Sequence, residues 1–190
     1  NLAFDASVMR LAIIWRGQFM NGQRHWTGRG QGFQPPAGDD AFYFPNGAPF
    51  AKLDEVSSSW PPDETRASSI RFGGYRFDDK QRPSFTYYIG RAKVTDYSKP
   101  VGSDPNLALV REITIEQNGE NLEGLVFRAG IGTVEQEEGY VLAKQIKCKV
   151  EGAEAVMIKK SGNPRADGDL RVSVKVINGK AKIRLTYSWI

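Results

Sequence analysis

The fold is decided by the stretch Leu170-Arg171-Val172-Ser173-Val174-Lys175-Val176, which runs through Asn178-Gly179 into Lys180-Ala181-Lys182-Ile183-Arg184-Leu185-Thr186-Tyr187-Ser188-Trp189. Apolar and polar residues alternate on both sides of Asn178-Gly179, and successive side chains of a strand point to opposite faces. An Asn-Gly pair favours a type I′ turn, because both central residues of that turn have a positive φ. The stretch therefore predicts a β-hairpin with one buried face and one solvated face. The residues expected in the core are Val172, Val174, Ile183, Leu185 and Tyr187.

Shorter stretches of the same kind follow one another upstream, at residues 110–116, 122–129, 140–143, 146–150 and 155–159, separated by Gly, Asn and Asp. Many short strands with turn residues between them are typical of an all-β sandwich. Cys148 lies between Ile146 and Val150 with a period of two, so we expect it to be a small buried residue. The sequence predicts an all-β fold, a two-sheet antiparallel β-sandwich.

The first hundred residues are less regular. Residues 10–19 are largely apolar, and the pair Ile13-Ile14 with Trp15 favours a strand there over a helix. Residues 22–69 are rich in Gly, Pro, Asp and Ser but also contain aromatic residues, which disordered segments lack. We expect a long ordered loop in this N-terminal half, packed over one end of a sheet. The chain is predicted to be one β-sandwich domain, 1–190, with an irregular half at 1–100 and a regular strand half at 106–190.

Composition excludes several kinds of chemistry. The chain has 190 residues, a net charge of +4, one Cys and one His. One Cys cannot form an internal disulfide, and one Cys with one His cannot build a zinc site of the Cys/His type. No Cys-x-x-Cys-His motif is present, so we expect no haem attached to this chain. The basic residues are dispersed, which predicts a solvated surface and no nucleic-acid partner. The sequence contains no apolar run of 18 residues, so we expect no membrane-spanning helix.

Acidic residues occur in adjacent groups at 39–40, 54–55, 63–64, 78–79 and 135–138. Glycoside hydrolysis needs two carboxylates about 5–10 Å apart across a cleft. Adjacent acids on a strand point to opposite faces, so each doublet supplies at most one such group. We assign no catalytic residue and no metal ligand. A glycan-processing enzyme that uses two carboxylates from the N-terminal half stays an alternative.

The densest cluster of polar and aromatic residues contains Arg24, His25, Trp26 and Arg29, with glycines at 28 and 30. It is a candidate ligand-binding site: Trp26 offers a ring face to a sugar, and the guanidinium groups of Arg24 and Arg29 offer hydrogen-bond donors. The competing interpretation is a turn in which Trp26 fills an edge of the core. His25, without a second histidine, is expected to be an ordinary surface residue.

Several motifs in the first hundred residues resemble those of one family. The motifs are, in order, Asn1-Leu2-Ala3-Phe4-Asp5, Arg10-Leu11-Ala12, Trp15, Gly17, Phe19, Trp26-Thr27-Gly28-Arg29-Gly30, Phe72-Gly73-Gly74-Tyr75-Arg76-Phe77-Asp78 and Arg82-Pro83-Ser84-Phe85-Thr86-Tyr87. Together they resemble an uncharacterised module of large envelope proteins from planctomycetes and related bacteria, which occurs beside c-type cytochrome domains. The resemblance covers roughly residues 1–100.

The resemblance implies a setting more than a reaction. It implies a periplasmic or cell-envelope location, haem c in neighbouring domains of a larger multidomain protein, and one of those cytochrome domains as a partner. Because the chain begins at Asn1, we expect it to be a fragment of such a protein. The expected function is a non-catalytic binding or docking module. The alternative is a glycan-binding module or a glycan-processing enzyme domain.

Overall fold

Nearly all regular structure in this chain is β-sheet. The computed structural model describes residues 1–27, 32–62, 70–132, 134–136, 139–159 and 168–190; only the backbone is described for Arg24, residues 134–136 and Lys159. Within these residues the strands form three antiparallel sheets, and one short helix, α1 (Gln23–Trp26), accompanies them.

The large sheet has eight strands in the order β10-β11-β12-β15-β8-β7-β6-β5, the small sheet has the order β13-β14-β9-β4, and the third sheet has the order β1-β2-β3. The bounds of the strands are β1 (Leu2–Asp5), β2 (Arg10–Ile14), β3 (Phe42–Tyr43), β4 (Phe50–Lys52), β5 (Ile70–Phe77), β6 (Pro83–Ile89), β7 (Ala92–Val101), β8 (Ala108–Glu116), β9 (Leu125–Ile131), β10 (Val134–Gln136), β11 (Gly139–Leu142), β12 (Ile146–Glu151), β13 (Ala155–Lys159), β14 (Gly168–Ser173) and β15 (Lys180–Trp189).

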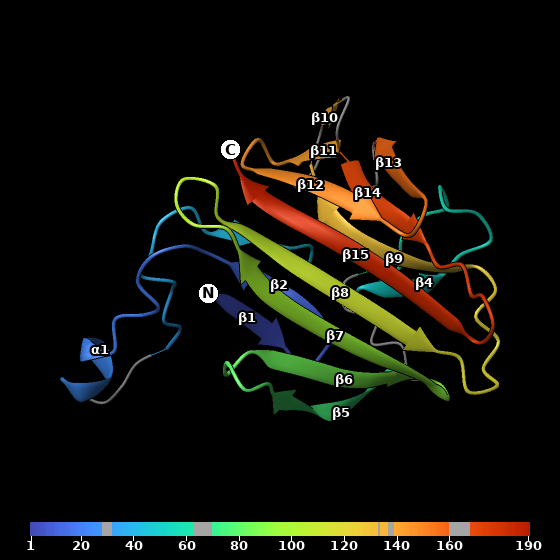
Figure 1. Cartoon of the computed structure of the whole chain (residues 1–190), viewed down its shortest axis with the longest axis horizontal. Coiled ribbons are helices and arrows are strands. Elements are labelled where there is room, and N and C mark those ends of the chain that lie inside the picture. The colour runs from blue at the N-terminus through green and yellow to red at the C-terminus, as the bar shows by residue number, and fades with distance from the viewer. Residues whose placement is uncertain (28–31, 63–69, 133, 137–138, 160–167) are drawn as a thin grey trace.

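The sheets pack as two layers. Figure 1 shows the large sheet in front, with β1, β2, β4 and β9 behind it, and α1 on an arm that extends away from the sheets. The core lies between the layers, where Ile113 and Ile115 of β8 and Leu185 of β15 face Phe127 of β9, all of them buried. Each such side chain contributes about 1.5–3 kcal/mol when fully buried. The predicted all-β sandwich is confirmed.

The predicted core residues of the C-terminal stretch are buried, except that Val174 is only half-buried against the core. The predicted hairpin is wrong, although its turn forms, with φ of 51° at Asn178 and 76° at Gly179. β14 pairs with β13 and β9 in the small sheet, whereas β15 pairs with β8 and β12 in the large sheet. Because both edges of β15 are already occupied, β14 cannot pair with it. The chain crosses between the layers at residues 174–177.

The predicted loop at 22–69 contains regular structure. Besides α1, it contributes β3 to the three-stranded sheet and β4 to the small sheet, where Phe50 lies opposite Phe127. Residues 28–31 and 63–69 of this stretch are outside the described part of the chain. At residues 10–14 the chain forms the strand β2, as the β-branched residues indicate. The irregular half therefore builds part of the second layer.

The core encloses an ion pair. Arg111 of β8 and Asp96 of β7 both point inward, and the Nε and Nη2 atoms of Arg111 donate to Oδ1 and Oδ2 of Asp96 at 2.9 and 2.5 Å. The Tyr87 hydroxyl donates to the same carboxylate at 3.4 Å, and the guanidinium lies 5.2 Å from the centre of the Phe127 ring. Burial alone would lower the pKa of Arg111, but the carboxylate of Asp96 outweighs it and raises the pKa. Both charges are therefore retained in the core.

Burial of weak acids in the core predicts a loss of stability at alkaline pH. Burial raises the pKa of the Cys148 thiol to about 12. The folded state then holds this proton more tightly than the unfolded state, so the stabilisation is full below the thiol's unfolded pKa. It is lost as the pH rises towards the folded value, by up to about 1.4 kcal/mol per pH unit. We expect urea unfolding at about pH 8 and about pH 10.5 to show a smaller loss in Cys148→Ala than in the unaltered chain.

Tyr87 provides the internal control for that comparison. Burial, followed by the charge of Asp96, raises the pKa of its hydroxyl as well. Its contribution to the alkaline loss is the same in both proteins and cancels in the difference. Equal losses in both proteins would contradict the buried, protonated state of Cys148.

Candidate functional site

The ligand-binding set predicted from the sequence lies on the arm, not on either sheet. α1 holds the backbone of Arg24 together with His25 and Trp26, and Arg29 lies outside the described residues. The Trp26 side chain is 87% exposed, so it does not fill an edge of the core, and the competing interpretation is wrong. The contacts of this segment are local: the N–H of His25 donates to the Gly22 carbonyl at 3.0 Å. The binding role of the set stays a prediction.

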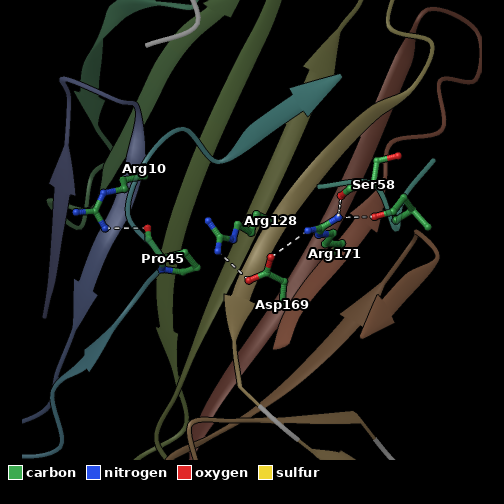
Figure 2. Close-up of polar contacts among 7 residues, drawn as sticks. Arg10, Pro45, Ser58, Arg128, Asp169 and Arg171 are labelled. Carbon is green, nitrogen blue, oxygen red and sulfur yellow. Dashed lines mark hydrogen bonds and ion pairs between the residues drawn. The ribbon is translucent and has the colours of Figure 1, made fainter. Parts of the chain in front are cut away.

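A second candidate is a cluster of arginines on the far side of the small sheet, where Figure 2 shows Asp169 between Arg128 and Arg171. Nη2 of Arg128 and Nη2 of Arg171 lie 2.8 and 3.2 Å from the two carboxylate oxygens of Asp169. Arg171 also donates to the carbonyls of Val56 and Ser58 at 2.7 and 2.6 Å, and its guanidinium lies 5.2 Å from the centre of the Trp60 ring. These contacts fasten the loop at 56–60 onto the sheet.

That cluster corrects one expectation. The alternating pattern of the C-terminal stretch places Arg171 on a solvated face, but the residue is fully buried. A buried charge is tolerated when it is paired and hydrogen-bonded, and here a carboxylate and two carbonyls accept from it. Arg10 acts in a similar way, since it donates to the carbonyl of Pro45 at 3.0 Å and holds β2 against the segment at 44–49 (Figure 2). Both arginines support the fold.

The large sheet presents a different surface. Its outer face carries a groove of about 650 Å³ over β8, β12 and β15. The strand register places Glu112 opposite Arg184 and Arg184 opposite Glu151, and in the next row Thr114 opposite Lys182. The residues that line the groove are Glu112, Ile113, Thr114, Glu151, Gly152, Lys182, Ile183 and Arg184.

Charges of both signs alternate along this groove. The Nη1 atom of Arg184 lies 2.9 Å from Oε1 of Glu112, and its Nε atom lies 3.4 Å from Oε2 of Glu151. Lys182 is exposed and makes no ion pair with the residues that the structure describes. Carboxylates accept hydrogen bonds, ammonium and guanidinium groups donate them, and the Thr114 hydroxyl does both. The groove can therefore form several hydrogen bonds to a ligand rich in hydroxyl groups.

The same geometry does not support acid–base catalysis. Glu112 and Glu151 flank one guanidinium, that of Arg184, and each serves as its charge partner. Acids of the N-terminal half are also engaged where their contacts are described: Asp40 pairs with Arg16, and Asp78 accepts from the N–H groups of Lys80 and Arg82. Among the described residues, no group of three His, Cys, Asp or Glu is placed to hold a metal ion.

Sequence reasoning missed the groove. Its residues are the polar members of alternating strands, a pattern that by itself indicates only a solvated face. What brings Thr114 and Lys182 together is the pairing of β8 with β15, and Glu151 joins them through the pairing of β12 with β15. The groove could have been predicted only from the order of the strands in the large sheet.

These features define a β-sandwich module with a polar groove on its larger sheet. Residues 2–96, half of the chain, match the model of a family described as a domain of unknown function, DUF6797. The chain belongs to this family. The search of curated proteins found no match. The search of solved structures found no match either. No helix among the described residues is long and apolar enough to cross a membrane.

The matched region ends inside a sheet. Residue 96 falls within β7, whose neighbour β8 lies wholly beyond the match, and β4 pairs with β9, which also lies beyond it. The groove is formed by β8, β12 and β15, so it lies outside the matched residues as well. The sandwich is thus built from strands on both sides of this boundary.

Proposed function

We propose that this chain is a non-catalytic binding module of a larger multidomain protein, and that the groove on the outer face of the large sheet is its ligand site. The observation that carries the proposal is the groove of about 650 Å³, which falls within the usual size range of ligand pockets. The ligand class that fits its lining is a glycan, because sugar hydroxyl groups both donate and accept hydrogen bonds.

The setting of the module rests on the sequence motifs. Their resemblance to modules of planctomycete-type envelope proteins supports a periplasmic or cell-surface location and neighbouring domains that carry haem c. In that setting the module binds a ligand or docks onto a cytochrome domain. A glycan-processing enzyme domain is the weaker alternative, because the two carboxylates of the groove are both paired with Arg184.

A glycan-binding screen on the whole chain tests the proposal. We expect binding to at least one glycan class, with a loss of about ten- to hundred-fold in Arg184→Ala, because a hydrogen bond to a charged group contributes about 1.5–3 kcal/mol. Lys182→Ala is expected to weaken binding in the same direction. Isothermal titration calorimetry with the selected glycan measures both effects, and the melting temperature confirms that each variant is folded.

Two controls make the screen decisive. Lys175→Ala removes an exposed cation that pairs with Glu154 and does not line the groove, so affinity should not change. Trp26→Ala tests the arm. If Trp26→Ala loses binding and Arg184→Ala keeps it, the ligand site lies on the arm and not in the groove. If the chain binds no glycan, the glycan proposal is refuted.

A further inference from the structure

One edge of the large sheet has an unusual surface. β5 (Ile70–Phe77) is the last strand at that edge and pairs only with β6 within the described residues. Tyr75 and Phe77 of this strand are 59% and 55% exposed, although they are large aromatic side chains. An edge strand offers unpaired backbone N–H and C=O groups, to which another extended chain can pair.

A β-bulge sorts the side chains of β5 between the two faces. The register shifts between Phe72 and Gly74, and Gly74 has a φ of 118°, which favours glycine. After the shift, Tyr75 lies opposite Phe85 on the inner face, and Arg76 lies opposite Ser84 on the outer face. Arg71, before the shift, lies opposite Tyr88 and is also on the outer face. The bulge thus places both arginines on one face of the strand.

The inner face at this edge is aromatic and only partly covered. Phe4 of β1 stacks on Phe85, with ring centres 3.9 Å apart. Tyr75 lies 6.4 Å from Phe85 and 5.4 Å from Phe77, so the rings form one continuous patch. Where Phe4 ends, nothing among the described residues covers Tyr75 and Phe77, which accounts for their exposure. Isolated apolar side chains are common on surfaces, but a contiguous aromatic patch marks an interaction site.

The outer face at this edge has an excess of positive charge. The lysines of the neighbouring strand β7 on that face are paired: Lys93 lies 3.8 Å from Glu116, and Lys99 lies 3.4 Å from Glu112. Arg71 and Arg76 are exposed and make no ion pair with described residues; the guanidinium of Arg71 lies 4.3 Å from the centre of the Tyr88 ring. No described residue supplies a charge complement for these two arginines, so both guanidinium groups are open to an acidic partner.

We propose that β5 is a docking edge for an extended acidic segment of a partner protein, which adds to the large sheet as an additional strand. Alternate side chains of an added strand point to opposite faces. On the outer face, its acidic residues meet Arg71 and Arg76. On the inner face, its apolar residues cover Tyr75 and Phe77. The chemistry of the edge therefore specifies a partner segment in which acidic and apolar residues alternate.

A second copy of this chain does not fit the same edge. If the β5 strands of two copies paired antiparallel, their outer faces would form one continuous surface. Arg71 and Arg76 of one copy would then lie beside the same arginines of the other copy. Like charges at opposing positions of a sheet are unfavourable. The two arginines thus disfavour self-pairing and favour an acidic strand, and the uncovered aromatic side chains need the apolar half of that strand.

Fluorescence anisotropy with labelled synthetic peptides tests the proposal. The probe is an extended peptide of alternating Glu and Val, and its counterpart has Lys in place of Glu. We expect the Glu peptide to bind and the Lys peptide not to bind. The double variant Arg71→Glu, Arg76→Glu should weaken binding of the Glu peptide at least about ten-fold and should gain binding of the Lys peptide, because the charge complement is reversed.

Three controls separate docking from general charge attraction. The double variant Lys144→Glu, Lys175→Glu changes the net charge equally on exposed residues away from β5, and it should bind the Glu peptide unchanged. N-methylation at alternate residues of the peptide should abolish binding, because strand pairing needs its N–H groups. Amide shifts on binding should fall on 70–77. The proposal would be overturned if both double variants bound the Glu peptide equally, if the N-methylated peptide bound, or if no peptide bound at all. Sedimentation of the unaltered chain as a dimer would overturn it as well.

Discussion

A fragment that ends at residue 96, the boundary of the family match, is expected to be unfolded on its own. It would retain β1 to β6 and half of β7 but would lose β8, the strand whose inner face carries Ile113 and Ile115. It would also lose β9, on which β4 pairs and against whose Phe127 the Phe50 ring lies, with ring centres 5.0 Å apart. Without β8, β9 and the other strands beyond residue 96, the remaining strands cannot bury enough apolar surface to offset the chain entropy lost on folding.

Proton NMR and far-ultraviolet circular dichroism of the 2–96 fragment and of the whole chain measure this directly. The whole chain should give dispersed amide signals and a cooperative thermal transition, and the fragment should give neither. Addition of a separate fragment, residues 97–190, should restore dispersion if the two pieces reassemble. A dispersed spectrum from 2–96 alone would show that the matched region is an independent domain, contrary to the shared sheets.

Asp96→Ala is expected to be the most destabilising single substitution in the core. It leaves the guanidinium of Arg111 buried without its carboxylate, and the loss of one partner of a buried ion pair costs about 3–5 kcal/mol. That is a large fraction of the roughly 5–15 kcal/mol by which a domain of ordinary stability is folded. Urea unfolding followed by tryptophan fluorescence gives the free energy of unfolding of each variant.

The double variant Asp96→Leu, Arg111→Met separates the charge from the packing. Replacement of both partners by apolar side chains of similar size is often neutral or stabilising, so we expect most of the lost stability to return. The matched surface control is Glu112→Ala, which removes a partly exposed carboxylate next to Arg111 on β8 and should cost under about 1 kcal/mol. If Asp96→Ala costs no more than Glu112→Ala, the account of the buried pair is wrong.

The sequence predicts well those features that depend on neighbouring residues. Alternation places Ile183, Leu185 and Tyr187 in the core, because side-chain direction in a strand follows from position alone. The Asn178-Gly179 turn forms for the same local reason. Cys148 is buried as its apolar neighbours indicate.

Features that depend on which strands meet were not predicted. The hairpin prediction for β14 and β15 fails because sheet partners are chosen by long-range packing, and local alternation carries no information about them. Arg171 is buried because Asp169 and the carbonyls of a distant loop meet it. The groove has the same origin: Thr114 and Lys182 become neighbours only through strand pairing, whereas the predicted Trp26 site rests on residues adjacent in sequence.

Amide chemical-shift mapping shows directly whether the outer face of the large sheet is the ligand site. The whole, isotope-labelled chain is titrated with the glycan that the screen selects. We expect the largest shifts at Thr114, Lys182 and Arg184, with saturation at the affinity that calorimetry gives. Shifts confined to Gln23–Trp26, or no shifts on β8 and β15 at saturating glycan, would contradict it.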